Sequence, residues 1–96
     1  MEAVRKAVEF QVIGRVQGVG YRYFAQTHAL MLGVKGWVKN LPDGTVMGHA
    51  VGTPDQLVSF FHKLLEGPSF SRVDDLREKP LGEQMVYRYG DFSIVR

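Results

Sequence analysis

The segment 14–22, Gly-Arg-Val-Gln-Gly-Val-Gly-Tyr-Arg, combines residue types that together could hold an anion. Glycine-rich turns allow successive backbone N–H groups to point inward around a negative charge. A helix that begins after such a turn adds its own unpaired N–H groups at the same place. Arg22 would stand at the start of that helix, where the helix dipole disfavours a cation unless an anion lies beside it. The pattern therefore predicts an anion site, although a glycine-rich connector with a surface arginine explains the spacing alone equally well.

Two familiar phosphate-binding motifs do not describe this segment. The P-loop of nucleotide-binding proteins requires Gly-Lys followed by Ser or Thr after its last glycine, and this segment has no such sequence. The dinucleotide fingerprint requires a third glycine at the position where Tyr23 stands. An anion site in this segment is therefore of another kind.

A second segment with chemical potential is 36–46, Gly-Trp-Val-Lys-Asn-Leu-Pro-Asp-Gly-Thr-Val. Strand alternation places Asn40 on the same face as Val38, so Asn40 faces the helix-covered side of a sheet if Val38 faces the core. A carboxamide there could accept a hydrogen bond from a water and donate one to a phosphoryl oxygen. Taken by itself, Asn40 has a simpler explanation as the residue that opens the turn at Pro42-Asp43-Gly44.

The hydrophobic spacing predicts the elements that must position these two segments. It indicates strands at 7–14, 34–41, 45–52, 71–79 (an edge strand) and 89–95, helices at 22–32 and 53–66, and a loop at 82–85. The order is strand-helix-strand-strand-helix-strand with one extra late strand. This order predicts a ferredoxin-like α+β fold, in which a mostly antiparallel sheet carries two helices on one face. We expect the whole chain, residues 1–96, to form this single domain.

The second helix has the most complete sequence signals. Thr53 and Gln56 form a capping-box pattern around Pro54, and Gly67-Pro68 ends the helix. The residues that we expect in the core from this helix and from strand 34–41 are Leu57, Phe60, Phe61, Leu64, Leu65 and Trp37.

Composition limits the compartment and the partners. The chain has 96 residues, a net charge of +2 and no Cys, which excludes disulfides, thiolate metal sites and Cys-dependent catalysis. No apolar run reaches the ~18 residues that cross a membrane, and the start, Met1–Lys6, lacks the apolar stretch of a signal peptide. We therefore expect a cytoplasmic protein with no membrane partner. Residues 1–40 hold six Lys or Arg and two Glu, which favours an anionic partner for this part of the chain.

Taken together, the two segments resemble the acylphosphatase family. Residues 14–22 match its pattern G-R-V-Q-G-V-x-[FY]-R, and residues 36–46 match its second pattern, G-W-V-x-N-x-x-x-G-x-V. Their order and separation also fit, and the resemblance extends over essentially the whole chain. Gly20 occupies a variable position of the first pattern. Leu41 stands where some members have a small hydroxyl residue, so any contact from that hydroxyl is lost here.

The resemblance implies hydrolysis of the carboxyl–phosphate bond of acyl phosphates without a metal, a cofactor or a covalent intermediate. It implies that Arg22 binds the phosphate and that Asn40 positions the attacking water. The phosphate-binding residues that it implies are Arg15, Val16, Gln17, Gly18, Val19, Gly20, Tyr21 and Arg22, the first seven through their backbone N–H groups. The expected partners are a small acyl phosphate and inorganic phosphate, as product or inhibitor. We expect the protein to be a monomer.

Two other functions compete with this one. RNA-recognition domains share the order of elements but need exposed aromatic residues on two central strands. Here Phe10 belongs to the apolar face and strand 45–52 has no aromatic residue, so we expect no nucleic-acid partner. The other alternative is a stand-alone relative of the acylphosphatase-like domain of carbamoyl-transfer maturation proteins, which is normally part of a far longer chain. His28, His49 and His62 come from three separate elements, and we expect none of them to act in catalysis.

Overall fold

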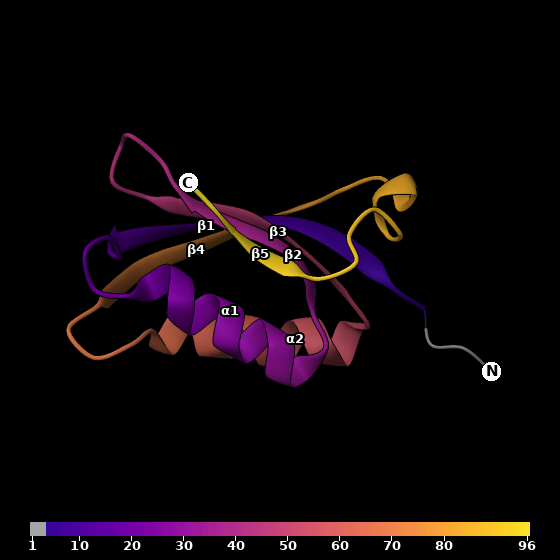
Figure 1. The fold of residues 1–96 in the computed structure, drawn as a ribbon, viewed down its shortest axis with the longest axis horizontal. Helices are drawn as coiled ribbons and strands as arrows, with labels where there is room; N and C mark the ends of the chain where they lie inside the picture. Colours follow the sequence, from indigo (N-terminus) through magenta and orange to yellow (C-terminus); the bar gives the residue numbers. More distant parts are fainter. Residues whose placement is uncertain (1–3) are drawn as a thin grey trace.

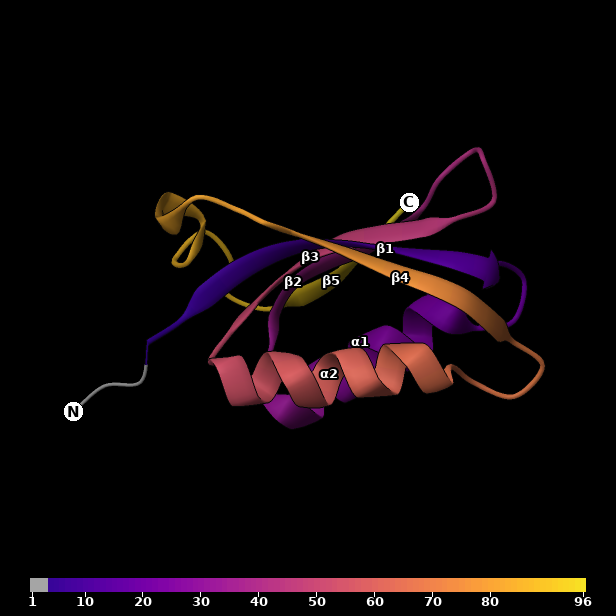
Figure 2. The ribbon, with the colours of Figure 1, turned by 180° about the vertical axis from the view of Figure 1, so that it is seen from behind.

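In the computed structural model, residues 4–96 form one five-stranded sheet and two helices. The elements are β1 (Lys6–Arg15), α1 (Tyr21–Leu32), β2 (Lys35–Asn40), β3 (Val46–Gly52), α2 (Pro54–Glu66), β4 (Arg72–Pro80), the 3-10 turn η1 (Glu83–Met85) and β5 (Phe92–Val95). Figures 1 and 2 show both helices on the same face of the sheet. The first three residues, part of the N-terminal stretch considered above, lie outside the described residues.

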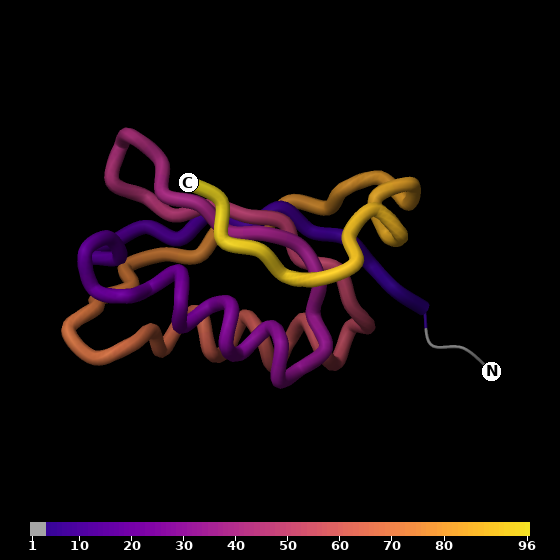
Figure 3. The backbone as a smooth tube through the Cα atoms, viewed as in Figure 1, coloured from indigo at the N-terminus to yellow at the C-terminus, as the bar shows by residue number. Residues whose placement is uncertain are grey.

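The strands follow the order β4-β1-β3-β2-β5 across the sheet. All neighbouring strands are antiparallel except β2 and β5, which run parallel. The expected ferredoxin-like α+β fold, with two helices on one face of a mostly antiparallel sheet, is confirmed. This topology brings the β1–α1 loop and the β2–β3 turn to the same end of the molecule (Figure 3).

The hydrophobic core lies between the sheet and the two helices. Phe10 and Val12 from β1 and Val38 from β2 have no exposed surface, because alternate residues of these strands face the helices. The ring of Phe60 from α2 meets the rings of Phe10 and Phe92 edge to face, at centroid distances of 5.9 and 5.6 Å. These contacts hold β1 and β5 against α2, and so fix the strand that leads into the β1–α1 loop.

Helix α2 begins as its sequence predicts. The N–H of Gln56 donates to Oγ1 of Thr53 at 3.2 Å, and the N–H of Thr53 donates to Oε1 of Gln56 at 2.9 Å, which completes the capping box. The buried residues of α2 are Leu57, Phe60, Phe61 and Leu64. The expectation that Leu65 joins them is wrong, because Leu65 lies roughly 80° around the helix from Leu57 and is 50% exposed.

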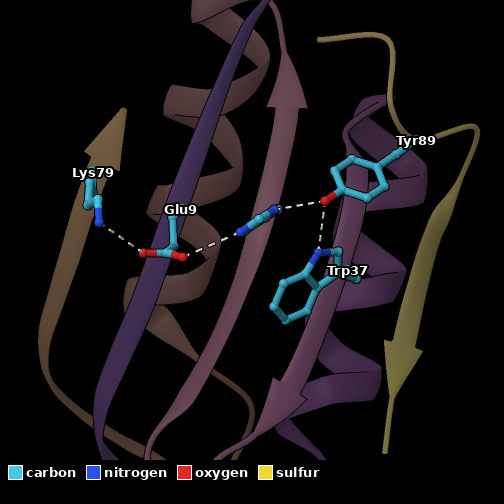
Figure 4. A network of polar contacts seen from close by, with 5 residues as sticks. Glu9, Trp37, Lys79 and Tyr89 are labelled. Carbon is cyan, nitrogen blue, oxygen red and sulfur yellow. Dashed lines mark hydrogen bonds and ion pairs between the residues drawn. The ribbon is translucent and has the colours of Figure 1, made fainter. Parts of the chain in front are cut away.

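The opposite face of the sheet is covered only in part, by the segment 81–89, whose Val86 packs against Ala7 and Val51. Trp37 lies on this face rather than in the core. Val38 takes the core side, so its neighbour Trp37 must point the other way. Nε1 of Trp37 donates to the hydroxyl of Tyr89 at 3.1 Å, and that hydroxyl lies 2.8 Å from Nδ1 of His49. Nε2 of His49 lies 3.4 Å from a carboxylate oxygen of Glu9 (Figure 4). The indole is therefore held by polar partners on the outer face.

The C-terminal third differs from the sequence-based prediction in two places. The last strand begins at Phe92 instead of Tyr89, because Tyr89 turns over the open face of the sheet to reach Trp37 and His49. Residues 82–85, expected as a loop, contain the 3-10 turn η1, in which the N–H of Val86 donates to the carbonyl of Glu83. The predicted edge strand is confirmed as β4, whose side chains are mostly charged and exposed, as is typical of a protected sheet edge.

Gly36 in β2 leaves no room for a side chain. Its φ is +140°, and an added Cβ would collide with the carbonyl oxygen of His49 on the neighbouring strand. We expect Gly36→Ala to lower the free energy of unfolding by about 2–4 kcal/mol, measured by urea denaturation. Gly90→Ala is the matched control, since a Cβ at that position meets nothing within 4 Å. Equal losses in the two variants would contradict this steric explanation.

Candidate active site

The β1–α1 loop, residues 16–20, has the backbone form of an anion-binding turn. Gly18 and Gly20 have φ values of +74° and +77°, a left-handed conformation that glycine adopts without steric cost. Among the loop and cap hydrogen bonds of residues 4–96, none has a backbone N–H donor from residues 16–20. The loop therefore holds a row of N–H groups that can donate to an external acceptor.

Helix α1 continues this arrangement, because it begins at Tyr21 directly after the loop. The first N–H groups of a helix have no partner within the helix. The first turn of α1 holds no acidic residue, and Gly20 at the N-cap provides no side-chain hydrogen bond. The positive end of the helix dipole is thus left without an internal negative partner, which favours an external anion at this position.

A hollow of about 160 Å³ lies at the start of α1 and brings the two predicted catalytic residues together. Its wall is formed by Val16, Gly18, Gly20, Tyr21, Arg22, Tyr23 and Asn40. Asn40 reaches the hollow from β2, because it pairs with Val46 of β3, which in turn pairs with Val12 near the end of β1. Three of the predicted phosphate-binding residues, Arg15, Gln17 and Val19, belong to the same segment but do not line the hollow.

A larger hollow, of about 370 Å³, lies over β2 and β5 beside Tyr89. Its wall includes Trp37, Lys39 and Tyr89 and none of the residues predicted to bind phosphate or water. Trp37 and Tyr89 already use their polar atoms in the network on the open face. The smaller hollow, with its free backbone donors, is therefore the candidate active site.

Gln17 fixes the loop to the β2–β3 turn through its side chain. Nε2 of Gln17 donates to the carbonyl oxygens of Leu41 and Thr45, each at 2.9 Å. The carboxamide is thereby directed at the turn and not at the hollow, so only the backbone of Gln17 remains for an anion. The sequence carries no signal for this contact, because its partners lie in another segment of the chain.

Asn40 is the last residue of β2 and lies on the core side of the strand, as its alternation with Val38 predicts. Its Oδ1 is buried and accepts no hydrogen bond from the described residues. The turn is instead held by Asp43, whose Oδ1 accepts from the N–H and the hydroxyl of Thr45 at 3.0 and 2.6 Å. These bonds, the hydroxyl first, hold the pKa of Asp43 below its usual value. A buried acceptor without a partner is costly. A water that donates to the free Oδ1 of Asn40 removes this cost.

Arg22 is the second residue of α1 and extends toward β5. Its Nη1 lies 3.4 Å from the carbonyl oxygen of Val95, a long contact that uses one of five guanidinium donors. Among residues 4–96, no carboxylate lies within ion-pair distance of Arg22. The remaining donors can form two parallel hydrogen bonds to two oxygens of one phosphoryl group.

Tyr21 anchors the start of α1 in the core. Its side chain is 2% exposed, and its hydroxyl donates to the carbonyl oxygen of Leu64 in α2 at 2.6 Å. The phenol therefore points away from any ligand in the hollow, and only the backbone of Tyr21 is placed to contact one. Because Arg22 follows directly, this anchor also fixes the helix turn from which the guanidinium extends.

The burial of Tyr21 gives a pH dependence that can be measured. Burial raises the pKa of Tyr21 well above its ordinary value, whereas the unfolded chain loses this phenol proton near pH ~10. The contribution of the protonated Tyr21 phenol to the stability of the fold is therefore fully present below about pH 10, and it decreases as the pH rises further. We expect the free energy of unfolding, from urea denaturation, to decrease less steeply above about pH 10 in Tyr21→Phe than in the wild type. Equal slopes would contradict a role for this proton.

The histidines lie apart from the hollow. His28 packs against Phe24 with ring centroids 4.5 Å apart, His49 belongs to the network on the open face, and His62 is exposed on α2. Within the described part of the chain, no three His, Asp or Glu side chains gather as a metal site would require. The same residues include no helix that is long and apolar enough to cross a membrane.

Comparisons with known proteins show the family to which this chain belongs. The family model described as Acylphosphatase matches residues 8–94. A protein named Acylphosphatase from Leuconostoc mesenteroides is 50% identical over 90 residues, which are 93% of this chain and 97% of that protein. One from Nocardioides sp. is 40% identical over 87 residues, 91% of this chain and 88% of that protein.

A solved structure shows the same likeness in three dimensions. The crystal structure of acylphosphatase from Bacillus subtilis matches with a TM-score of 0.89 and 38% sequence identity, over 97% of this chain and 100% of that one. The family match covers nearly the whole chain and includes both segments that form the hollow. The chain therefore belongs to the acylphosphatase family.

Proposed function

We propose that this protein is an acylphosphatase, which hydrolyses the carboxyl–phosphate bond of a small acyl phosphate to a carboxylate and inorganic phosphate. The observation that carries the proposal is the hollow at the start of α1. It combines a guanidinium, backbone N–H groups of the loop and the buried Oδ1 of Asn40, for none of which residues 4–96 supply a carboxylate or hydrogen-bonding partner in the hollow. The family membership supports the same activity.

The phosphoryl group is bound by the loop and by Arg22. Two guanidinium N–H groups donate to two phosphoryl oxygens, and backbone N–H groups of the β1–α1 loop donate to the third. These donors are already in place in the folded protein, so little reorganisation is needed as charge redistributes in the transition state. Donors of this kind contribute roughly 2.7–4 kcal/mol each to transition-state stabilisation.

The water is positioned by Asn40. Its Oδ1 accepts a hydrogen bond from the water and turns the water oxygen toward phosphorus. A bond forms between this oxygen and phosphorus while the bond from phosphorus to the acyl oxygen breaks, and its electron pair leaves with the carboxylate. The carboxylate is a good leaving group and needs little acid catalysis, so a phosphoryl oxygen of the substrate can take the proton from the water. Positioning and charge neutralisation are then the main contributions of the protein.

Several finer properties belong to the same proposal. The reaction uses no metal and no cofactor, and inorganic phosphate binds in the hollow as product or inhibitor. The protein acts as a cytoplasmic monomer with a single acylphosphatase-like domain over residues 1–96. Arg5, Lys6, Lys35 and Lys39 favour the approach of an anionic substrate without contacting it, and Arg15 contributes through its backbone N–H.

The alternative of a nucleic-acid-binding module receives no support from the open face of the sheet. The polar atoms of Trp37, His49 and Tyr89 bond to one another, and the rings of Trp37 and His49 pack together with centroids 4.7 Å apart. Strand β3 carries no Phe, Tyr or Trp for base stacking. Single-stranded nucleic-acid sites generally need such free aromatic faces.

Phosphate release from acetyl phosphate by the purified protein tests the proposal. We expect release far above the buffer rate, unchanged by a chelator and inhibited by inorganic phosphate in competition with the substrate. Release at the buffer rate, together with salt-dependent retention on RNA, would instead favour the nucleic-acid alternative. Loss of activity on chelation would contradict the metal-independent reaction.

A further inference from the structure

The candidate active site has one large aromatic side chain at its exposed edge, Tyr23. Of the side chains that line the hollow, Val16 and Tyr21 are 1% and 2% exposed, whereas Tyr23 is 68% exposed. Glycines form much of the remaining wall, and Arg22 and Asn40 present polar groups. Tyr23 is therefore the single apolar surface that the hollow offers to a group extending out of it.

Tyr23 has neither a ring partner nor a hydrogen-bond partner in the part of the chain that the structure describes. Its neighbours on α1 pair their rings, since Tyr21 packs near Phe24 and Phe24 packs against His28. Within residues 4–96, the ring of Tyr23 pairs with no other aromatic ring and its hydroxyl takes part in no hydrogen bond. An exposed tyrosine that has no internal partner and stands beside a binding hollow is available to a ligand.

The direction of the reaction places the acyl group on the side of Tyr23. The free acceptor of Asn40 is buried, so the attacking water lies on the inner side of the hollow. In phosphoryl transfer the attacking and leaving oxygens lie roughly in line on opposite sides of phosphorus. The acyl group must then point toward the open side, where the Tyr23 ring is exposed.

We propose that Tyr23 is a specificity-determining residue whose ring packs against the acyl group and favours aromatic or long apolar acyl phosphates over acetyl phosphate. This inference rests on the proposed function. An aryl group gains contact area and ring–ring packing against a tyrosine, whereas an acetyl group offers one methyl. The phenol hydroxyl is not required for this contact, so the ring alone determines the preference.

Kinetics with two substrates tests the proposal. The quantity measured is the ratio of kcat/KM for benzoyl phosphate to kcat/KM for acetyl phosphate, in the wild type and in Tyr23→Ala, Tyr23→Phe and Tyr87→Ala. We expect the ratio to decrease by about five- to tenfold in Tyr23→Ala and to remain at the wild-type value in Tyr23→Phe. Tyr87→Ala is the matched control, because Tyr87 is 82% exposed and does not line the hollow.

The outcomes separate this inference from the proposed function. A wild-type protein that releases phosphate from neither substrate contradicts the proposed function itself. An active wild type whose ratio is unchanged in Tyr23→Ala overturns the role of Tyr23 alone, and so does an equal decrease in Tyr87→Ala. A ratio that decreases in Tyr23→Phe as much as in Tyr23→Ala overturns the packing explanation, because the ring is still present in the Phe variant.

Discussion

Replacing Arg22 with alanine is expected to lower kcat/KM for an acyl phosphate by about 10³-fold or more and to weaken inhibition by inorganic phosphate. Arg22 is the only cationic side chain on the wall of the hollow, and no carboxylate of residues 4–96 competes for it. Its removal leaves the phosphoryl group with backbone donors alone. Steady-state kinetics with benzoyl phosphate and phosphate inhibition measure both effects.

Lysine at the same position separates charge from geometry. Arg22→Lys keeps the positive charge but presents a compact ammonium that cannot form two parallel hydrogen bonds to one phosphoryl group. We expect this variant to remain far below the wild type in kcat/KM. Arg88→Ala, which removes an exposed cation outside the hollow, is the control for net charge. Wild-type kinetics in Arg22→Ala, or full rescue by lysine, would contradict the role given to the guanidinium.

The second large effect is expected from Asn40→Ala, which should lower kcat by about 10²–10³-fold while inhibition by phosphate remains at the wild-type level. The reason is that, in the proposed mechanism, the free Oδ1 of Asn40 accepts from the water, whereas Arg22 and the loop bind the phosphoryl group. A loss of kcat without a loss of phosphate inhibition distinguishes the role of Asn40 from that of Arg22. Both quantities are measured with benzoyl phosphate as substrate and inorganic phosphate as inhibitor.

Aspartate at position 40 provides the comparison. Asn40→Asp retains an oxygen that accepts from water but adds a negative charge beside the phosphate site. We therefore expect a lower kcat and also weaker inhibition by phosphate. A parallel loss of phosphate inhibition in Asn40→Ala would show that Asn40 binds the phosphoryl group instead of the water. Circular dichroism of each variant checks that the fold is retained.

The fold could be predicted well from the sequence because most of its elements have local signals. Period-two alternation identified β1, and the capping box at Thr53 identified the start of α2 to the residue. The prediction that Trp37 lies in the core is wrong, because it rested on the size and apolar character of the side chain and not on its place in the strand alternation. The alternation that puts Val38 in the core already puts Trp37 on the other face. The start of the last strand was predicted too early, because Tyr89 bonds to His49 and Trp37, which are 40 and 52 residues away in the sequence.

The sequence could predict that Arg22 and Asn40 come together at the candidate site, but it could not predict the contacts around them. Strand alternation placed Asn40 on the helix side, and the glycine pattern located the loop. The hydrogen bond of Arg22 to Val95 spans 73 residues, and those of Gln17 to the β2–β3 turn span 24 and 28. Contacts of this kind depend on the topology of the sheet and leave no local pattern. Tyr23 was likewise named only as a missing glycine, because exposure beside a hollow is a property of the folded chain.

The most direct test of the account is the position of the oxygen that water adds to the products. Because the water attacks phosphorus in the proposed mechanism, hydrolysis of benzoyl phosphate in ¹⁸O-labelled water by the wild-type protein should put one labelled oxygen into inorganic phosphate and none into benzoate. Mass spectrometry of both products measures the label. Labelled benzoate would show attack at the carbonyl carbon and would contradict the role of Asn40, the loop and Arg22 in phosphoryl transfer.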